Sequence, residues 1–342
     1  MANETIINKN FNGEYQVIIN HTVGNTIEVN YPVVEDGVKW ETDRQGSPSK
    51  LTFKVYKEKN SELNFQEGDS VVFNYRNDGG NWITLFVGYV FKKQRKKDGW
   101  IDVTAYDALR YLKNKGTYVF TNKTASDVLK MICNDYKLPI GTVESTNYVI
   151  GSRVEDNQTL FDIIQNALDL TLISSNKMYV LFTENGKVCL KDANNLKTNV
   201  VINDVTAEDF DYTSSIDDEV YNEIELYYDN DQTNKREYYH AIDSNNVGTW
   251  GRLRYTESVQ NPANAQDRAK KMLKLYNRKN RKLQVNKAFG DCQCRAGASV
   301  IVNLDLGDIK VSNYMLIEKA THIFKKDEYR MDLTLSNAEF SV

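Results

Sequence analysis

The feature that most constrains this 342-residue chain is a strand pattern that occurs twice, once in the first third and once in the last. Gly68-Asp69-Ser70-Val71-Val72-Phe73 resembles Gly297-Ala298-Ser299-Val300-Ile301-Val302, and Phe91-Lys92-Lys93 further on resembles Phe324-Lys325-Lys326. Each set is followed by a strand that alternates apolar residues with Asp and Thr: Ile101-Asp102-Val103-Thr104-Ala105 and Met331-Asp332-Leu333-Thr334-Leu335. Alternation with a period of two indicates half-buried strands. Either the chain contains two copies of one β unit, or the two segments share only generic strand chemistry.

Turn signals in the first third favour antiparallel hairpins. Asn77-Asp78-Gly79-Gly80 separates two β-rich runs, and Lys97-Asp98-Gly99 separates two more. Glycine accepts the positive φ that such tight turns require. Strands at this spacing predict a small barrel or sandwich.

The middle of the chain has helical periodicity. Thr124 is placed to cap a helix that continues until Lys137-Leu138-Pro139, and a second helix is predicted over residues 159–170. A tight hairpin is expected around Glu184-Asn185-Gly186-Lys187. In the last third, a single helix is predicted from Asn261-Pro262 to about residue 277.

These patterns predict a mainly β fold with an α+β insert, in which two related antiparallel β-barrels flank a small α+β domain. The expected domains are a first barrel over residues 1–114, the insert over 115–200, and a second barrel with one inserted helix over 201–342. A homotrimer of such a chain would present six similar barrels around a threefold axis. Cyclic contacts of this kind close into rings.

Several strings resemble the tail-hub proteins of contractile phages, R-type bacteriocins and type VI spike bases, and in particular their XkdQ/YqbQ branch. The resemblance covers roughly residues 15–340 and is carried by four strings: Phe65-Gln66-Glu67-Gly68-Asp69-Ser70-Val71, Phe86-Val87-Gly88-Tyr89-Val90, Val103-Thr104-Ala105-Tyr106-Asp107-Ala108-Leu109-Arg110-Tyr111-Leu112, and Gln158-Thr159-Leu160-Phe161-Asp162. It implies a homotrimeric baseplate hub that docks under the tail tube protein, carries the spike protein and contacts other baseplate proteins. Such a protein is made in the bacterial cytoplasm and built into a phage or bacteriocin particle. The resemblance brings no catalytic residues.

Charge is segregated in the last third. Residues 203–231 contain eleven acidic and no basic residues, whereas residues 262–287 contain nine basic residues and one acidic residue, a net charge of +8. Two solvated faces would explain this, and so would complementary contacts between subunits or with the tube. A third charged run lies at the predicted hairpin tip around residue 95, where it either keeps an edge soluble or docks the tube. The candidate interface residues are Lys92, Lys93, Arg95, Lys96, Lys97, Arg268, Lys270, Lys271, Lys274, Arg278, Asp217, Asp218 and Glu219.

Other classes of function have weaker support. The chain carries a net charge of −4, and Tyr276 is the single aromatic residue in the basic segment, so specific nucleic-acid binding is not expected. A carbohydrate- or nucleic-acid-binding β module is the alternative, and a cell-wall hydrolase is a third hypothesis.

Enzyme and metal signals are sparse. The chain contains no Gly-x-Ser-x-Gly, phosphate-loop or His-Glu-x-x-His motif. The spacing of Cys133, Cys189, Cys292 and Cys294 does not match a zinc site, and His322 is expected to face a core or an interface. We therefore expect no catalytic residues, no cofactor and no metal. No apolar run could span a membrane, and the N-terminus is not typical of an export signal.

Overall fold

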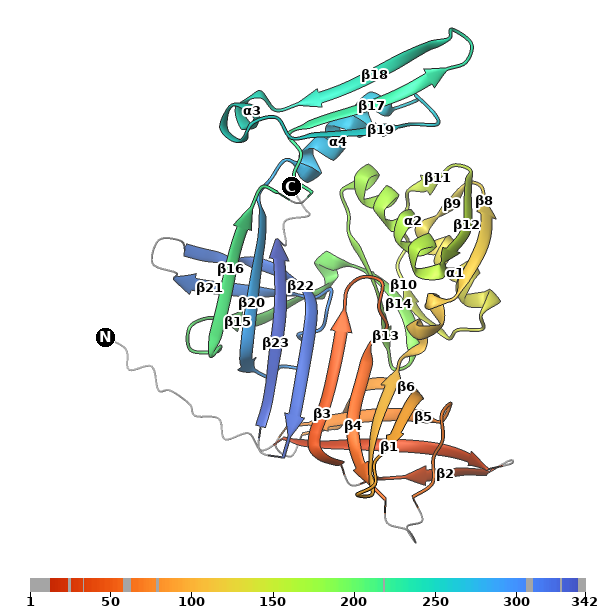
Figure 1. Cartoon of the computed structure of the whole chain (residues 1–342), viewed down its shortest axis with the longest axis vertical. Helices are drawn as coiled ribbons and strands as arrows, with labels where there is room; N and C mark the ends of the chain where they lie inside the picture. The colour runs from red at the N-terminus through yellow and green to blue at the C-terminus, as the bar shows by residue number, and fades with distance from the viewer. Residues whose placement is uncertain are drawn as a thin grey trace.

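The structure, a computed structural model, describes residues 13–23, 26–32, 34–57, 63–77, 80–217, 219–305, 310–326 and 328–337. Strands dominate it, as predicted (Figure 1). Asp78 and Gly79 of the first predicted turn lie outside the described residues, although the strands on either side pair as a hairpin.

Thirteen strands of the described residues form one large sheet. They are β1 (Glu14–Val23), β2 (Thr26–Asn30), β3 (Val34–Asp43), β4 (Lys50–Tyr56), β5 (Ser70–Arg76), β6 (Ile83–Arg95), β7 (Trp100–Tyr106), β15 (Lys197–Ile202), β16 (Asp209–Ser215), β20 (Asn280–Phe289), β21 (Ser299–Asp305), β22 (Lys310–Lys325) and β23 (Glu328–Asn337). Their main order is β16-β20-β23-β22-β3-β4-β7-β6-β5-β1-β2. Strand β21 branches off from β22, and β15 pairs with β21.

Two five-stranded units with the same topology lie within this sheet. In the first, the spatial order is β3-β4-β7-β6-β5, and in the second it is β16-β20-β23-β22-β21. Each unit uses its strands in the same sequence order, and all the pairs within a unit are antiparallel. We call these the first and second sheet units. Each unit is flanked by a sixth strand, but the direction of this strand differs between the units. Strand β1 is antiparallel to β5, whereas β15 is parallel to β21.

Two backbone details occur at corresponding places in both units. Gly68 and Gly297 have φ values of +95° and +87° just before β5 and β21, a conformation that glycine adopts without strain. The Gly68 N–H donates to the Val90 carbonyl and the Gly297 N–H to the Ile317 carbonyl, both at 2.8 Å.

A β-bulge follows in each unit. The register shifts after Val90↔Ala105 in the first and after Ile317↔Leu335 in the second. A bulge adds one residue to one strand and is a specific local feature. Its occurrence at matching positions supports two copies of one unit rather than generic strand similarity.

The structure corrects one part of the sequence comparison. Because Val90 corresponds to Ile317, Phe91 corresponds to Glu318. Phe324 lies six residues further along β22, close to the turn into β23. The Phe-Lys-Lys strings therefore match in letters but not in position.

The sheet order also differs from two closed barrels. Among the described strands the sheet has free ends at β16 and β2, so we find no closed barrel. The reason is that β22 is long enough to pair with β23 on one side and with β3 on the other, which merges the two units into one sheet. The division of the chain at residues 114 and 200 stays a prediction.

The predicted α+β insert follows β7. It contains η1 (Ala108–Lys113), β8 (Lys115–Phe120), β9 (Lys123–Thr124), α1 (Ala125–Asp135), β10 (Ile140–Val143), β11 (Val149–Ile150), β12 (Arg153–Thr159), α2 (Leu160–Ser175), β13 (Tyr179–Glu184), β14 (Lys187–Asp192) and η2 (Ala193–Leu196). Thr124 caps α1, as predicted, and it forms a capping box with Asp127. Thr159 caps α2. The two helices bury their apolar sides in one core with Leu112 and Leu190.

A second insertion lies between β16 and β20, within the second sheet unit. It contains β17 (Glu223–Asn230), β18 (Lys235–Ile242), α3 (Ser244–Trp250), β19 (Arg254–Ser258) and α4 (Ala265–Tyr276). Figure 1 shows it at one end of the molecule, with α4 against the three-stranded sheet. We call it the distal unit. The sequence analysis predicted the helix α4, but not the small sheet beside it.

Candidate assembly interface

The basic cluster around residue 95 lies on an unpaired strand edge. Lys92, Lys93 and Arg95 belong to the last part of β6, and Lys96 and Lys97 follow in the turn to β7. Within the described residues, this part of β6 pairs with β7 alone. All of these side chains except that of Lys93 are exposed. The Lys93 ammonium group donates to the Phe65 carbonyl and lies over the Phe65 ring.

A second unpaired edge belongs to β16, which is one end of the main strand order. Asp209 and Asp211 lie on this strand, and Asp217 and Glu219 follow it. In the described part of the chain β16 pairs with β20 alone. Asp218, another candidate interface residue, lies outside the described residues.

The basic candidates of the last third lie on or near the distal unit. Arg268, Lys270, Lys271 and Lys274 are on α4, and Arg278 follows it. Arg268 pairs with Glu257 at 2.8 Å, and Lys271 pairs with Asp267 one helical turn away at 3.0 Å. Two of these candidates therefore have partners inside the same unit.

The acidic and basic segments also meet within the chain. Strand β16 is antiparallel to β20, which places Thr213 opposite Lys282 and Ser214 opposite Arg281. Lys287 pairs with Glu208 at 3.1 Å. Part of the charge segregation seen in the sequence is thus satisfied intramolecularly. The β6 cluster, the β16 acids and the α4 cations do not form one continuous site.

Sequence reasoning missed a buried hydrogen-bonded contact where the insert meets both sheet units. Asp107, which follows β7, accepts a hydrogen bond at 2.6 Å from the Thr183 hydroxyl of β13. Arg295, which precedes β21, donates to the Thr183 carbonyl at 3.0 Å and stacks over Phe182 at 4.0 Å. Burial raises the pKa of Asp107 to about 6 and lowers that of Arg295 to about 10. These residues join the three parts of the chain, and nothing in their local sequence patterns indicates it.

His322 occupies another junction between the sheet units. It is fully buried and stacks on Trp40 of β3, with 4.9 Å between ring centroids. Its Nε2 lies 2.8 Å from the Cys294 carbonyl and its Nδ1 lies 2.9 Å from the Tyr329 hydroxyl. Nε2–H donating and Nδ1 accepting satisfies both contacts with a neutral ring. Burial lowers the pKa of His322 to about 4. The expectation that His322 faces a core or an interface is confirmed.

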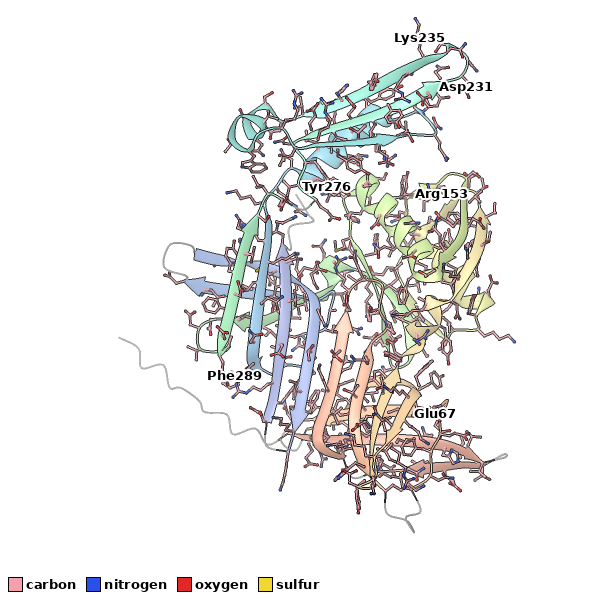
Figure 2. All side chains as sticks on the ribbon, in the orientation of Figure 1. Glu67, Arg153, Asp231, Lys235, Tyr276 and Phe289 are labelled. Atoms are coloured by element: carbon pink, nitrogen blue, oxygen red, sulfur yellow. The ribbon has the colours of Figure 1, made fainter. Side chains whose placement is uncertain are left out.

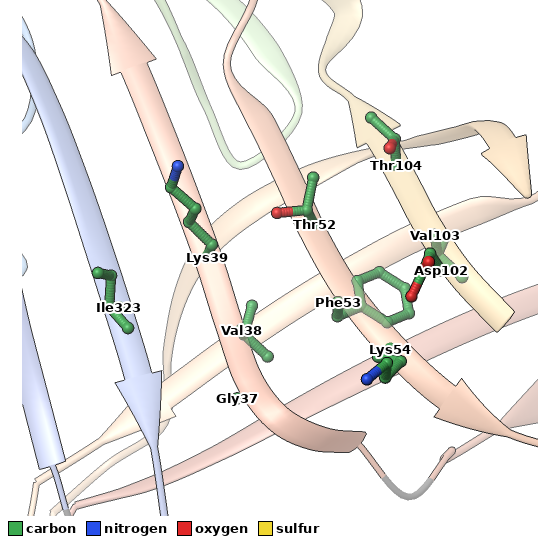
Figure 3. A pocket seen from close by; sticks show the side chains of 10 residues that line it. All are labelled: Gly37, Val38, Lys39, Thr52, Phe53, Lys54, Asp102, Val103, Thr104 and Ile323. Carbon is green, nitrogen blue, oxygen red and sulfur yellow. The ribbon is translucent and has the colours of Figure 1, made fainter. Parts of the chain in front are cut away.

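The hollows on the surface bring together few side chains that could bind a ligand or catalyse a reaction. One, of about 390 Å³, lies over β3, β4 and β7 and is lined by Lys39, Thr52, Lys54, Asp102 and Thr104 (Figure 3). Its one carboxylate, Asp102, pairs with Lys96 at 2.8 Å. No group of three or more potential metal-ligating side chains occurs among the described residues.

A larger hollow lies between the insert, the second sheet unit and the distal unit. It has a volume of about 1080 Å³ and includes Arg44, Asp169, Tyr276 and Glu318 in its lining. Tyr276, at the end of α4, is labelled in Figure 2, which also shows Asp231 and Lys235 at the tip of the β17–β18 hairpin. Helices in the described part of the chain are too short or too polar to cross a membrane.

Comparison with known proteins shows which family the chain belongs to. Residues 38–336 match the family described as YqbQ-like. The chain belongs to the YqbQ-like family. The resemblance predicted from the sequence is therefore confirmed.

Two relatives of this YqbQ-like chain come from Bacillus subtilis (strain 168). The "Uncharacterized protein YqbQ" is 29% identical over 88% of this chain and 91% of the relative. The "Phage-like element PBSX protein XkdQ" is 27% identical over 88% and 92%.

Solved structures share the YqbQ-like fold at low sequence identity. A tail protein from Neisseria meningitidis MC58 has a TM-score of 0.66 at 14% identity, covering 95% of this chain and 97% of that one. The 43 kDa tail protein of prophage MuSo2 from Shewanella oneidensis has a TM-score of 0.65 at 11% identity, covering 94% and 98%. The chain therefore has the fold of phage tail proteins.

Proposed function

We propose that this chain is the structural hub of a tail baseplate, a homotrimer that adapts a sixfold tail tube to a threefold spike. The observation that carries the proposal is the pair of sheet units with one topology and matching bulges. Three chains contribute six such units, so a ring with exact threefold symmetry approximates sixfold symmetry. Cyclic, heterologous contacts close into rings of this type.

The named relatives support the setting. XkdQ is named as a protein of a phage-like element, and the two solved neighbours above are named as tail proteins. The Escherichia coli c3393 protein, with a TM-score of 0.51 at 9% identity over 90% of this chain and 75% of that one, is described as a component of the type VI secretion system similar to T4 tail proteins gp27 and gp5. A place beside tube, spike and other baseplate proteins, after synthesis in the bacterial cytoplasm, agrees with these names.

The proposed mechanism is geometric and involves no catalysis. The six sheet units would meet the six subunits of a tube ring at similar contacts, while the three distal units would mark the true threefold axis. The contacts between subunits would be large and permanent, as in obligate assemblies.

Deleting the gene in the producing bacterium tests this role. We expect particles without a complete baseplate, and we expect the wild-type gene supplied in trans to restore them. Electron microscopy of restored particles should show three copies between tube and spike. Normal baseplates in the deletion strain, or a stoichiometry other than three, would contradict the proposal.

A further inference from the structure

The junction between β22 and β3 shows how two sheet units join inside one chain. Residues 319–324 of β22 pair antiparallel with residues 38–43 of β3, so that His322 lies opposite Trp40. Two side-chain contacts fasten the end of this ladder. Arg44 pairs with Glu318 at 2.6 Å, and the Ala296 N–H donates to the Thr42 hydroxyl at 2.9 Å.

Each of these two strands has a counterpart elsewhere in the large sheet. The bulge that aligns Ile317 with Val90 makes β6 the counterpart of β22, so that Arg95 takes the place of His322. The ladders through β4 and β7, and through β20 and β23, make β16 the counterpart of β3, so that Tyr212 takes the place of Trp40.

These two counterparts do not meet within the chain. In the described residues β16 pairs with β20 alone, and residues 92–95 of β6 pair with β7 alone. Unpaired strand edges present rows of N–H and C=O groups that readily accept another strand. The edge of β6 is basic, whereas β16 carries Asp209 and Asp211 and is followed by Asp217 and Glu219. The two edges are complementary in charge.

We propose that β16 of one copy pairs antiparallel with residues 92–96 of the next copy, repeating the β22–β3 junction between subunits. The equivalence fixes the register as Lys92 with Ser215, Lys93 with Ser214, Gln94 with Thr213, Arg95 with Tyr212, and Lys96 with Asp211. This inference rests on the trimer proposed above and assigns its interface.

The side chains at this register are chemically matched. Arg95 meets the ring of Tyr212 where His322 meets Trp40, which suits a cation–π contact. Lys96 lies opposite Asp211 with the opposite charge.

Two further contacts have counterparts. Ser214 takes the place of Thr42, and its hydroxyl is positioned to accept from the N–H of Glu67, the counterpart of Ala296. The ion pair Arg44–Glu318 is replaced by Ile216 and Phe91, an apolar pair.

This pairing also accounts for aromatic side chains on the surface of the first sheet unit. The ring centroid of Phe91 lies 5.6 Å from that of Tyr106 and 6.0 Å from that of Tyr111. The ring centroids of Tyr89 and Tyr111 are 6.3 Å apart. Tyr89 and Tyr111 are each 36% exposed. The contact between Phe91 and Ile216 of the next copy would bring part of this group into the interface.

Disulfide trapping of the full chain tests the register. Gln94→Cys with Thr213→Cys places the two thiols directly opposite one another, within the Cβ separation that cross-strand pairs allow. Gln94→Cys with Ser214→Cys is the matched control, because neighbouring strand residues point to opposite faces. All three positions are exposed, so the substitutions leave the cores intact. A Cys292→Ser background removes the one native cysteine that is not buried.

We expect mild oxidation to give a covalent trimer with the first pair, at least about tenfold more than with the control. Native mass spectrometry of the same samples, before oxidation, reports the assembly itself. A trimer without preferential trapping of the Gln94–Thr213 pair would overturn this junction and leave the hub proposal standing. A chain that stays monomeric at its highest soluble concentration would overturn both.

Charge reversal gives a second, independent readout. Lys96→Glu should weaken the trimer about tenfold, in the range of a close interfacial charge pair, and adding Asp211→Lys should restore it. Lys130→Glu, on an exposed lysine of α1 in the insert, is the matched control and should leave the trimer unchanged. Equal weakening by Lys96→Glu and by the control would contradict the proposed pairing.

Discussion

The two sheet units have the same strand order but different cores. The buried core of the first contains eight aromatic side chains among 18 residues, whereas the buried core of the second contains none among 15. Phe53 and Phe73 of the first correspond to Val285 and Val302 of the second. What the units share is backbone structure, namely a left-handed glycine, a bulge and a meander. This comparison teaches that topology can persist in a duplicated unit while the volumes of its core side chains change.

The largest difference in stability between equivalent substitutions in the two units is expected at Phe324, where the two units meet. This ring is fully buried and lies 4.1 Å from the Tyr329 ring and 5.0 Å from the Phe73 ring. Phe324→Ala should lower the free energy of unfolding by about 3–5 kcal/mol, the usual cost of such a cavity. At the corresponding position of the first unit, Lys97→Ala should change it by less than about 0.5 kcal/mol. Urea denaturation measures the free energy of unfolding of both variants. Similar losses at the two positions would contradict the expected difference between the units.

A pH-dependent difference is expected at His322 and its counterpart Arg95. The folded-state pKa of His322 is about 4, below its ordinary value of 6.5, so the unfolded chain takes up the proton first as the pH falls. The stability from the neutral histidine is therefore present above pH 6.5 and is lost as the pH falls toward 4. The loss reaches about 3 kcal/mol.

Unfolding free energies of wild type and His322→Gln between pH 7 and 4 isolate this contribution. The difference between their free energies of unfolding should shrink by about 3 kcal/mol as the pH falls from 7 to 4. Comparison with the variant is necessary because Asp107, whose pKa is raised to about 6, has the opposite sign and stabilises the fold as the pH falls through 6. Arg95→Gln should leave the pH dependence unchanged, and an equal effect there would contradict the assignment.

The smallest difference is expected at the two left-handed glycines. An added Cβ at Gly68 meets nothing within 4 Å, so Gly68→Ala should cost only the left-handed backbone strain of about 1–2 kcal/mol. At Gly297 the same atom would lie 2.2 Å from Cγ1 of Val180, so Gly297→Ala should cost about 1–3 kcal/mol more. Thermal and urea denaturation of the two variants measure the difference. Equal costs would show that Val180 moves aside freely.

Local features of the fold could be predicted from the sequence, whereas long-range pairings could not. Thr124 and the Lys97-Asp98-Gly99 turn act on neighbouring residues, and both are found as expected. The pairing of β22 with β3 joins segments at opposite ends of the chain, and no local pattern specifies it. For the same reason two separate barrels were predicted where one sheet is found.

The candidate site shows the same division. Charged runs in the sequence identified the basic edge of β6, but which strand edges stay unpaired became visible only in the complete sheet. The contact between Asp107 and Thr183, with Arg295 beside it, depends on three distant segments. It therefore had no signature in any one of them.

The position of the distal unit has a consequence of its own. It interrupts the connection between the first two strands of the second sheet unit, whereas in the first unit the corresponding connection is the short segment between Asp43 and Lys50. The framework strands on both sides of the interruption still pair in the shared order. This connection is thus a place where the fold accepts additional sequence, and replacing the distal unit with a six-residue link copied from the first unit is a direct route to a minimal, internally repetitive scaffold.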